Sequence, residues 1–301
     1  MIKIDLPSNC QNYADVIDSC CNIMRDDNTL KSKIKENKND LLRVSEYYKH
    51  TAKTNHLFFH QYYKCEENCH IIITNKNINT VLTKHDMIKL YDEYFVKKRN
   101  DNNNHYYDTI INNAKDPTIY CPFCCGIGTP TEIDHFLPKS QCCYYSIFPY
   151  NLIPICKDCN QIYKKDFFPE YEKQLIHPYL DDNCFFNDQW LYAEYINIPN
   201  DIGTIKYFVK PPNHWSIDKK NKVEFHFNRF NLAERFFKKS CSPLSHELNS
   251  MKAYKKSGIS MNDFEQCSID SYLSEESRIN HWKRALYQAI KNSISTIWQN
   301  I

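Results

Sequence analysis

The chain has 301 residues, an apolar share of 42% and a formal net charge of +2. Its length predicts two or three structural units, and the apolar share allows a sizeable core. The four glycines form neither a G-x-G-x-x-G nor a Walker A pattern, which excludes the common glycine-rich phosphate loops. No apolar run reaches the roughly 18 residues of a membrane helix, and the first residues lack a signal-peptide core.

Fifteen cysteines would suit a secreted disulfide protein, but the missing export signal favours reduced thiols in the cytoplasm. The near-neutral charge argues against strong non-specific DNA binding by the chain as a whole. Local basic patches or a partner would therefore have to supply affinity for nucleic acid. We expect a cytoplasmic protein with no membrane segment.

Residues 1–114 are predicted to be a mainly helical region. Apolar side chains recur there at helical spacing in three segments: 16–24, 41–48 and 83–96. Asn28 is suited to capping a helix in the segment that follows it, although the density of Lys and Asn there is also typical of a loop. Thr83 and Asp86 have the spacing of a capping box for the third.

One cluster in this region has residue types that bind metals: His56, His60, Cys65, Cys69 and His70. On a helix, the two members of each four-residue pair would share a face. Ordinary histidines and thiols, in a chain rich in both, are the favoured interpretation. A second metal site stays open as the alternative.

The strongest metal signal is a pair of Cys-x-x-Cys sequences: Cys121, Cys124, Cys156 and Cys159. Zinc prefers four thiolate or imidazole ligands in a tetrahedron, and two such pairs supply them. Thirty-one residues separate the pairs, so a folded segment is expected between them. A segment this short needs a staple such as a structural zinc ion. Cys125 could replace Cys124 as a ligand, because spacing alone does not distinguish them.

The segment between the cysteine pairs is predicted to fold as strand, loop, strand and helix. The strands are expected at 131–136 and 152–155, the second broken by Pro154, and the helix begins after Cys156. At the end of the first strand, Asp134 offers the hard oxygen ligand that magnesium or manganese prefers. The neighbouring His135 titrates near neutral pH and can accept a proton from water.

These residues closely resemble the HNH endonuclease family, whose core is the ββα-metal fold. The family's motif letters match His135, Asn151 and Asn160, within an Asp-His-x-x-Pro sequence, a mid-loop asparagine and a Cys-x-x-Cys-Asn sequence. The resemblance covers roughly residues 115–170, about a fifth of the chain. Some members of the family carry zinc-binding paired Cys-x-x-Cys sequences, as this chain does.

The resemblance implies a role for each of these residues. His135 would be the general base, and Asn151 would pin the loop and orient that base. Asp134 and Asn160 would hold one catalytic divalent cation. The last motif position is Asn160 rather than a histidine, and family members with asparagine there resemble magnesium users. A site with only oxygen ligands is consistent with this, because magnesium prefers oxygen ligands.

Three lysines near this segment are candidates for contact with DNA phosphates: Lys139, Lys164 and Lys165. Such contacts would position the backbone without reading sequence. An ordinary solvated surface is the alternative for each lysine.

Residues 179–301 are predicted to form a small antiparallel sheet followed by helices. The strands are expected at three aromatic and β-branched segments: 190–196, 204–209 and 222–227. Further on, Trp282, Leu286, Ile290, Ile294 and Ile297 repeat at helical spacing. This spacing predicts a buried helix face, with a partner interface as the alternative.

The sequence thus predicts an α+β protein in three parts: residues 1–114, the zinc-stapled nuclease module 115–178, and residues 179–301. By resemblance, it should hydrolyse DNA with magnesium or manganese, leaving 3′-hydroxyl and 5′-phosphate ends. Large HNH proteins of bacteria resemble restriction and anti-phage effectors, some acting beside an ATPase, and double-strand cleavage would need a dimer or two visits. The alternatives are a non-catalytic zinc adaptor and a ribonuclease on the same scaffold.

Overall fold

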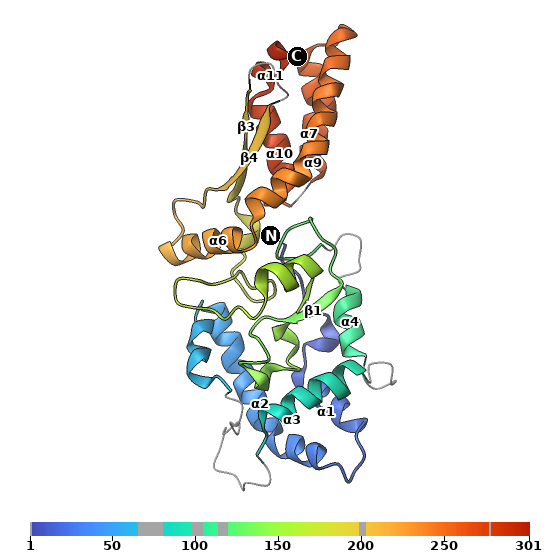
Figure 1. Ribbon diagram of the computed structural model, residues 1–301, viewed down its shortest axis with the longest axis vertical. Coiled ribbons are helices and arrows are strands. Elements are labelled where there is room, and N and C mark those ends of the chain that lie inside the picture. The colour runs from blue at the N-terminus through green and yellow to red at the C-terminus, as the bar shows by residue number, and fades with distance from the viewer. Residues whose placement is uncertain (1, 66–80, 98–104, 114–119, 199–202, 277) are drawn as a thin grey trace. The chain divides into compact units, whose positions relative to one another are not determined.

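The computed structural model describes residues 2–65, 81–97, 105–113, 120–198, 203–276 and 278–301 (Figure 1). Contacts divide the chain into two compact units. The N-terminal unit comprises Ile4–Pro122 and Thr129–Asp181, and the C-terminal unit comprises Met1–Lys3, Phe123–Gly128 and Asp182–Ile301. The N-terminal unit therefore holds the predicted helical region together with most of the predicted nuclease segment.

The N-terminal unit begins with the predicted helices. Its α-helices are α1 (Tyr13–Asn22), α2 (Thr29–Lys53), α3 (Lys84–Lys89) and α4 (Tyr106–Asn113). The side chain of Asn28 accepts a hydrogen bond from Leu30 N and caps α2, as predicted. Thr83 and Asp86 form the predicted capping box on α3, and a π-helical segment, Leu90–Lys97, continues from it. The described part of this unit also has short 3-10 turns at Ser8–Cys10, Leu57–Tyr63, Cys143–Tyr145 and Pro149–Asn151.

The N-terminal unit also contains a two-stranded antiparallel sheet, which follows α4 in the sequence. β1 (Glu132–His135) pairs with β2 (Leu152–Ile155), with Asp134 opposite Ile153 and His135 opposite Leu152. The expectation that Pro154 breaks the second strand was wrong, since Pro154 pairs with Ile133. Ile155 O accepts from Thr131 N at 3.1 Å, so the backbone groups of Ile155 face β1. Backbone groups of successive residues in a strand point in opposite directions, and the nitrogen of Pro154 therefore points away from β1, where no N–H donor is needed. A π-helical segment, Cys159–Lys164, follows β2.

The C-terminal unit combines a second antiparallel pair of strands with helices. β3 (Leu191–Ile196) pairs with β4 (Thr204–Val209), in agreement with two of the three predicted strands. The helices are α5 (Cys184–Asn187), α6 (Ile217–Arg229), α7 (Leu232–Lys256), α8 (Met261–Phe264), α9 (Ser271–Glu275), α10 (Trp282–Asn292) and α11 (Ile294–Asn300). Figure 1 shows α7 and α10 running alongside the β3–β4 pair.

The strand predicted at 222–227 is instead part of α6. Ser216 caps this helix by accepting from Lys219 N, and Val223 and Phe227 are buried four residues apart on one helix face. The alternation of apolar and polar residues over six positions resembled a strand. The burial four residues apart and the N-cap are both helical features.

The predicted apolar stripe near the C-terminus is buried, as expected. Leu286 and Ile290 are fully covered, and the other members, Trp282, Ile294 and Ile297, are nearly so. α10 packs against β3, and the stripe is therefore core in this unit rather than an exposed face. Within the described part of the chain, no helix has both the length and the apolar character needed to cross a bilayer.

Candidate metal centre and polar site

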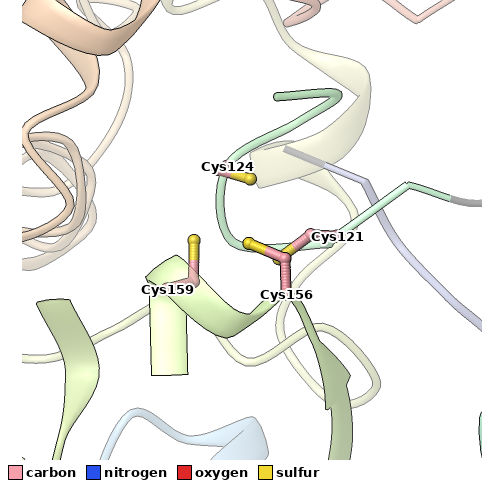
Figure 2. Close-up of side chains that lie close together, drawn as sticks. All are labelled: Cys121, Cys124, Cys156 and Cys159. Carbon is pink, nitrogen blue, oxygen red and sulfur yellow. The ribbon is translucent and has the colours of Figure 1, made fainter. Parts of the chain in front are cut away.

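Four buried cysteines converge as the spacing predicted: Cys121, Cys124, Cys156 and Cys159. Figure 2 shows their side chains pointing toward one another, and their Sγ atoms all lie within 4.8 Å of each other. Sulfurs around a tetrahedral zinc ion, each about 2.3 Å from the metal, are about 3.8 Å apart. The cluster therefore needs only a small contraction to hold zinc, and its all-thiolate donor set fits a structural zinc site.

The geometry favours Cys124 over Cys125 as the ligand. Cys125 is held with φ of +44°, and its Sγ donates to Asn280 O at 3.3 Å. This thiol is thus directed into a different contact, whereas Cys124 Sγ belongs to the four-cysteine cluster. The alternative left open by the spacing is resolved in favour of Cys124.

The second candidate cluster, for which ordinary histidines and thiols were the favoured interpretation, forms no metal-binding group among its described members. His60 is buried, with Nε2 2.8 Å from Thr51 Oγ1 and Nδ1 3.2 Å from Tyr145 OH. Burial lowers the pKa of His60 to about 4, so its ring is neutral at pH 7. Cys65 lies beside Cys143 rather than beside a histidine, and Cys69 and His70 lie outside the described residues.

Asp134 and His135 point to opposite faces of β1, which ends at His135. On one face, Asp134 Oδ2 lies 2.6 Å from Lys164 Nζ at the end of the π-helical segment. Burial raises the pKa of Asp134, and the nearby ammonium group opposes that rise. Asp134 is thus one half of a buried ion pair.

Lys164 occupies a different position from the one predicted. It is fully buried, and its Nζ also donates to His135 O at 2.8 Å. A buried lysine held by a carboxylate and a carbonyl is not available for a surface contact with phosphate. The prediction of such a contact for Lys164 is therefore corrected, because the side chain is directed inward onto β1.

His135 lies on the opposite, buried face of β1 and is 6% exposed. Its Nε2 lies 2.8 Å from Ser146 O, and its ring packs edge-on against Tyr91 with centroids 4.5 Å apart. A carbonyl only accepts, so Nε2 carries the proton and Nδ1 is left as the basic nitrogen. Burial lowers the pKa of His135 to about 3, which keeps the imidazole neutral at pH 7.

Asn151 clamps the loop that follows His135. Its Oδ1 accepts from Leu137 N at 2.7 Å, and its Nδ2 donates to Leu137 O at 3.1 Å. The same amide oxygen accepts from Tyr48 OH at 3.0 Å, and Asn151 is fully buried. A single side chain thus satisfies both backbone groups of one loop residue, which fixes the path of the chain two residues after His135.

Glu132 was not singled out from the sequence, although it shares the Asp134 face of β1. Its carboxylate accepts from Asn160 Nδ2 and from Gln161 Nε2, both at 2.8 Å. Because alternate residues of a strand share a face, its position two residues before Asp134 was the available signal. Glu132, Asp134 and Asn160 thus bring oxygen donors to one side of β1.

The two other predicted phosphate-contacting lysines differ in their surroundings. Lys139 Nζ pairs with Asp92 Oδ1 at 2.6 Å and lies 4.5 Å from the centroid of the Tyr91 ring. Lys165 is exposed at the end of the π-helical segment. A phosphate contact from Lys139 would therefore have to compete with a carboxylate, whereas Lys165 is accessible.

The chain is similar along nearly its whole length to Protein ea31 of Escherichia phage lambda. The two are 28% identical over 304 residues, covering 97% of this chain and 98% of that protein. The similarity therefore includes both units and not the cysteine-rich segment alone. No family model matches the chain. No solved structure matches it either.

Proposed function

We propose that the chain is a zinc-stabilised HNH endonuclease that hydrolyses DNA phosphodiester bonds. The observation that carries this proposal is the clamp made by Asn151 on Leu137, two residues beyond His135 on β1. These hydrogen bonds agree with the loop-pinning role that the resemblance implies for Asn151, the middle residue of the family's motif. The order of β1, loop, β2 and helix beside four converging cysteines supports a ββα-metal module in the same segment.

His135 supplies a base in the correct protonation state. Its Nε2 is bonded to Ser146 O, and the free Nδ1 can accept a proton from an attacking water. The low pKa keeps this nitrogen unprotonated at neutral pH but also makes it a weak base, so the burial that lowers the pKa must be relieved when substrate binds. Because the ring is only 6% exposed, DNA must displace part of its surroundings, which include the Tyr91 ring.

Asp134 and Asn160 would hold the divalent cation, with Glu132 close by. The donor set consists of oxygens, which fits magnesium or manganese in kind. Asn160 directs its amide nitrogen to Glu132, and this leaves the amide oxygen as its metal-binding atom. A bound cation there would supply stabilisation of the negative charge that develops on the phosphoryl group. It would share Asp134 with the ammonium group of Lys164.

The ion pair between Lys164 and Asp134 also supports a second candidate function, that of a non-catalytic zinc adaptor that binds nucleic acid or protein. Lys164 neutralises Asp134 in the absence of any other cation, and His135 is enclosed. In an adaptor, both features would be purely structural. The four cysteines would be required, and Asp134, His135 and Asn160 would not.

A cleavage assay separates these candidates. Zinc-loaded wild-type protein should nick supercoiled plasmid with magnesium and stop when EDTA removes it. Asp134→Asn and Asn160→Ala should each slow nicking by about 100-fold or more, as expected for loss of charge stabilisation. Asn262→Ala, at an exposed position in α8, is the matched control and should cut normally.

The products and substrates distinguish the remaining alternatives. Hydrolysis by water should leave 3′-hydroxyl and 5′-phosphate ends on DNA. Metal-independent cutting of RNA alone, with cyclic phosphate ends, would instead identify a ribonuclease that uses the 2′-hydroxyl. Binding of nucleic acid without cutting by any of the proteins would support the adaptor.

We further propose a role in bacterial restriction or anti-phage defence, by analogy with large HNH effectors. One catalytic site cleaves one strand. Double-strand cleavage would therefore require a homodimer or two successive events, and an ATPase partner would provide a trigger. Addition of a candidate ATPase to the nicking assay tests this role through an increase in rate.

A further inference from the structure

Two thiols of the N-terminal unit lie unusually close together outside the four-cysteine cluster. Cys143 Sγ is 2.8 Å from Cys65 Sγ, and neither cysteine is in a disulfide. A disulfide bond is about 2.05 Å long, so the sulfurs need to approach by only about 0.8 Å to bond. Cys65 is partly exposed and Cys143 is buried, so a reagent in solution would reach Cys65 first.

The backbone holds the two segments together at this point. Cys65 N donates to Gln141 O at 2.8 Å, and Tyr144 OH donates to Tyr63 O at 3.2 Å. These contacts flank the sulfur pair on both chain segments. The proximity of the two thiols is therefore a consequence of ordered backbone contacts, and bond formation requires little movement.

The pair also has the electronic asymmetry of a reactive dithiol. The hydrogen bond from Cys143 lowers the pKa of Cys65 to about 7, and the positive charge of Lys84 acts in the same direction. Cys65 is thus substantially thiolate at neutral pH, which is the nucleophilic form. The same contact and burial raise the pKa of Cys143, which remains a thiol until its partner reacts.

We propose that Cys65 and Cys143 are a reversible disulfide site that exchanges with a low-molecular-weight disulfide such as oxidised glutathione. The Cys65 thiolate attacks one sulfur of that disulfide, whose S–S bond breaks and releases one thiolate. Cys143 loses its proton and attacks Cys65 Sγ in the mixed disulfide, which releases the second thiolate. The two protein sulfurs are oxidised and one small disulfide is reduced to two thiolates. The proton lost by Cys143 and one proton from solvent, where Cys65 had released its own, convert these thiolates to thiols.

The bond would fix a turn that is connected to the polar site. Cys143 O accepts from Ser146 N at 3.0 Å, and Ser146 O is the partner of His135 Nε2. The two cysteines are 78 positions apart, so the disulfide would also constrain much of the unfolded chain. Oxidation should therefore stabilise the N-terminal unit.

The test uses full-length, zinc-loaded protein treated with oxidised glutathione and mapped by mass spectrometry without reduction. We expect a cross-linked pair of peptides containing Cys65 and Cys143 that separates on reduction. The melting temperature should rise by roughly 5 °C on oxidation and return on reduction. Cys65→Ser, at the more accessible position, should fold normally and lose both the cross-link and the shift.

Cys142→Ser is the matched control, because Cys142 is the adjacent buried thiol. It should keep the Cys65–Cys143 cross-link and the shift. A cross-link from Cys65 to Cys142, a stable adduct of glutathione on Cys65, or no modification of Cys65 would each overturn the proposal. None of these readouts depends on nuclease activity, so failure here leaves the proposed function standing.

Discussion

The four-cysteine cluster and the Asp134–His135 region lie in the same stretch of sequence, yet they are built in different ways. The cluster brings together like side chains from two short Cys-x-x-Cys sequences, and its Sγ atoms lie within 4.8 Å of each other. The polar region depends on partners from far along the chain. Asn151, for example, is bonded to Tyr48, 103 positions away.

This difference explains what each region requires of the rest of the fold. A thiolate cluster is defined by its own ligands, because a metal ion imposes their number and geometry. The protonation of Asp134 and His135 depends on burial and on contacts with Lys164 and with Ser146 O, respectively. Loss of a cluster ligand should therefore act on folding as a whole, whereas changes around β1 should act in smaller, separable steps.

The largest effect is expected from Cys156→Ser. This change removes one thiolate ligand, so zinc should be lost and the free energy of unfolding should fall by at least about 4 kcal/mol. Metal analysis and urea unfolding measure both quantities. Cys125→Ser should retain zinc, since Cys125 contacts Asn280 instead; loss of zinc from that control would contradict the ligand assignment.

Lys164→Met should have the next largest effect. It leaves the buried carboxylate of Asp134 without its partner, which should cost about 3–5 kcal/mol of stability in chemical denaturation. Lys165→Met, at the exposed neighbour, should change stability by less than about 0.5 kcal/mol. The double variant Asp134→Leu/Lys164→Met should recover most of the free energy of unfolding that Lys164→Met loses. If the losses of the two single variants simply add in the double variant, the two residues are not energetically coupled.

The pH dependence of stability should report His60, whose ring contacts Tyr145 beside Ser146. The folded pKa of about 4 is below the ordinary value, so the unfolded chain binds the proton first as the pH falls. Stability from this residue is thus present above about pH 6.5 and declines toward pH 4, by about 2 kcal/mol between pH 7 and pH 5. His60→Gln should flatten the profile by that amount, and a profile that is unchanged in this variant would contradict the assignment to His60.

Tyr48→Phe should have the smallest effect of the series. It removes one hydroxyl that contacts Asn151 Oδ1 at 3.0 Å and His177 Nε2 at 3.1 Å, at an expected cost of about 1 kcal/mol in urea unfolding. Tyr47→Phe, at the exposed neighbouring position, is the control. Equal effects of the two changes would show that the Tyr48 hydroxyl adds nothing to the clamp.

The sequence was most informative where a feature depends on a short, specific spacing of residues. Thr83 and Asp86 predicted the start of α3, and the two Cys-x-x-Cys pairs predicted the cluster, because each of these patterns spans only four residues. The strands β1 and β2 were also placed correctly, apart from the effect of Pro154.

Features that depend on long-range packing were missed or misjudged. Lys164 is an ordinary lysine in the sequence, and only the approach of the π-helical segment to β1 makes it an internal cation. The segment 222–227 has strand-like alternation over too few residues to exclude the helix that forms there. Glu132 could have been found by extending the two-residue period of β1 backward from Asp134.

We propose that His135 is the base of a nuclease held together by the cysteine cluster. The most direct measurement is the initial rate of plasmid nicking by wild type and His135→Ala, after metal analysis has shown equal zinc in both. We predict cutting by the wild type and a rate about 100- to 10,000-fold lower in the variant, as expected for loss of a general base. Equal rates in the two proteins, or no cutting by the wild type with magnesium or manganese, would contradict the claim.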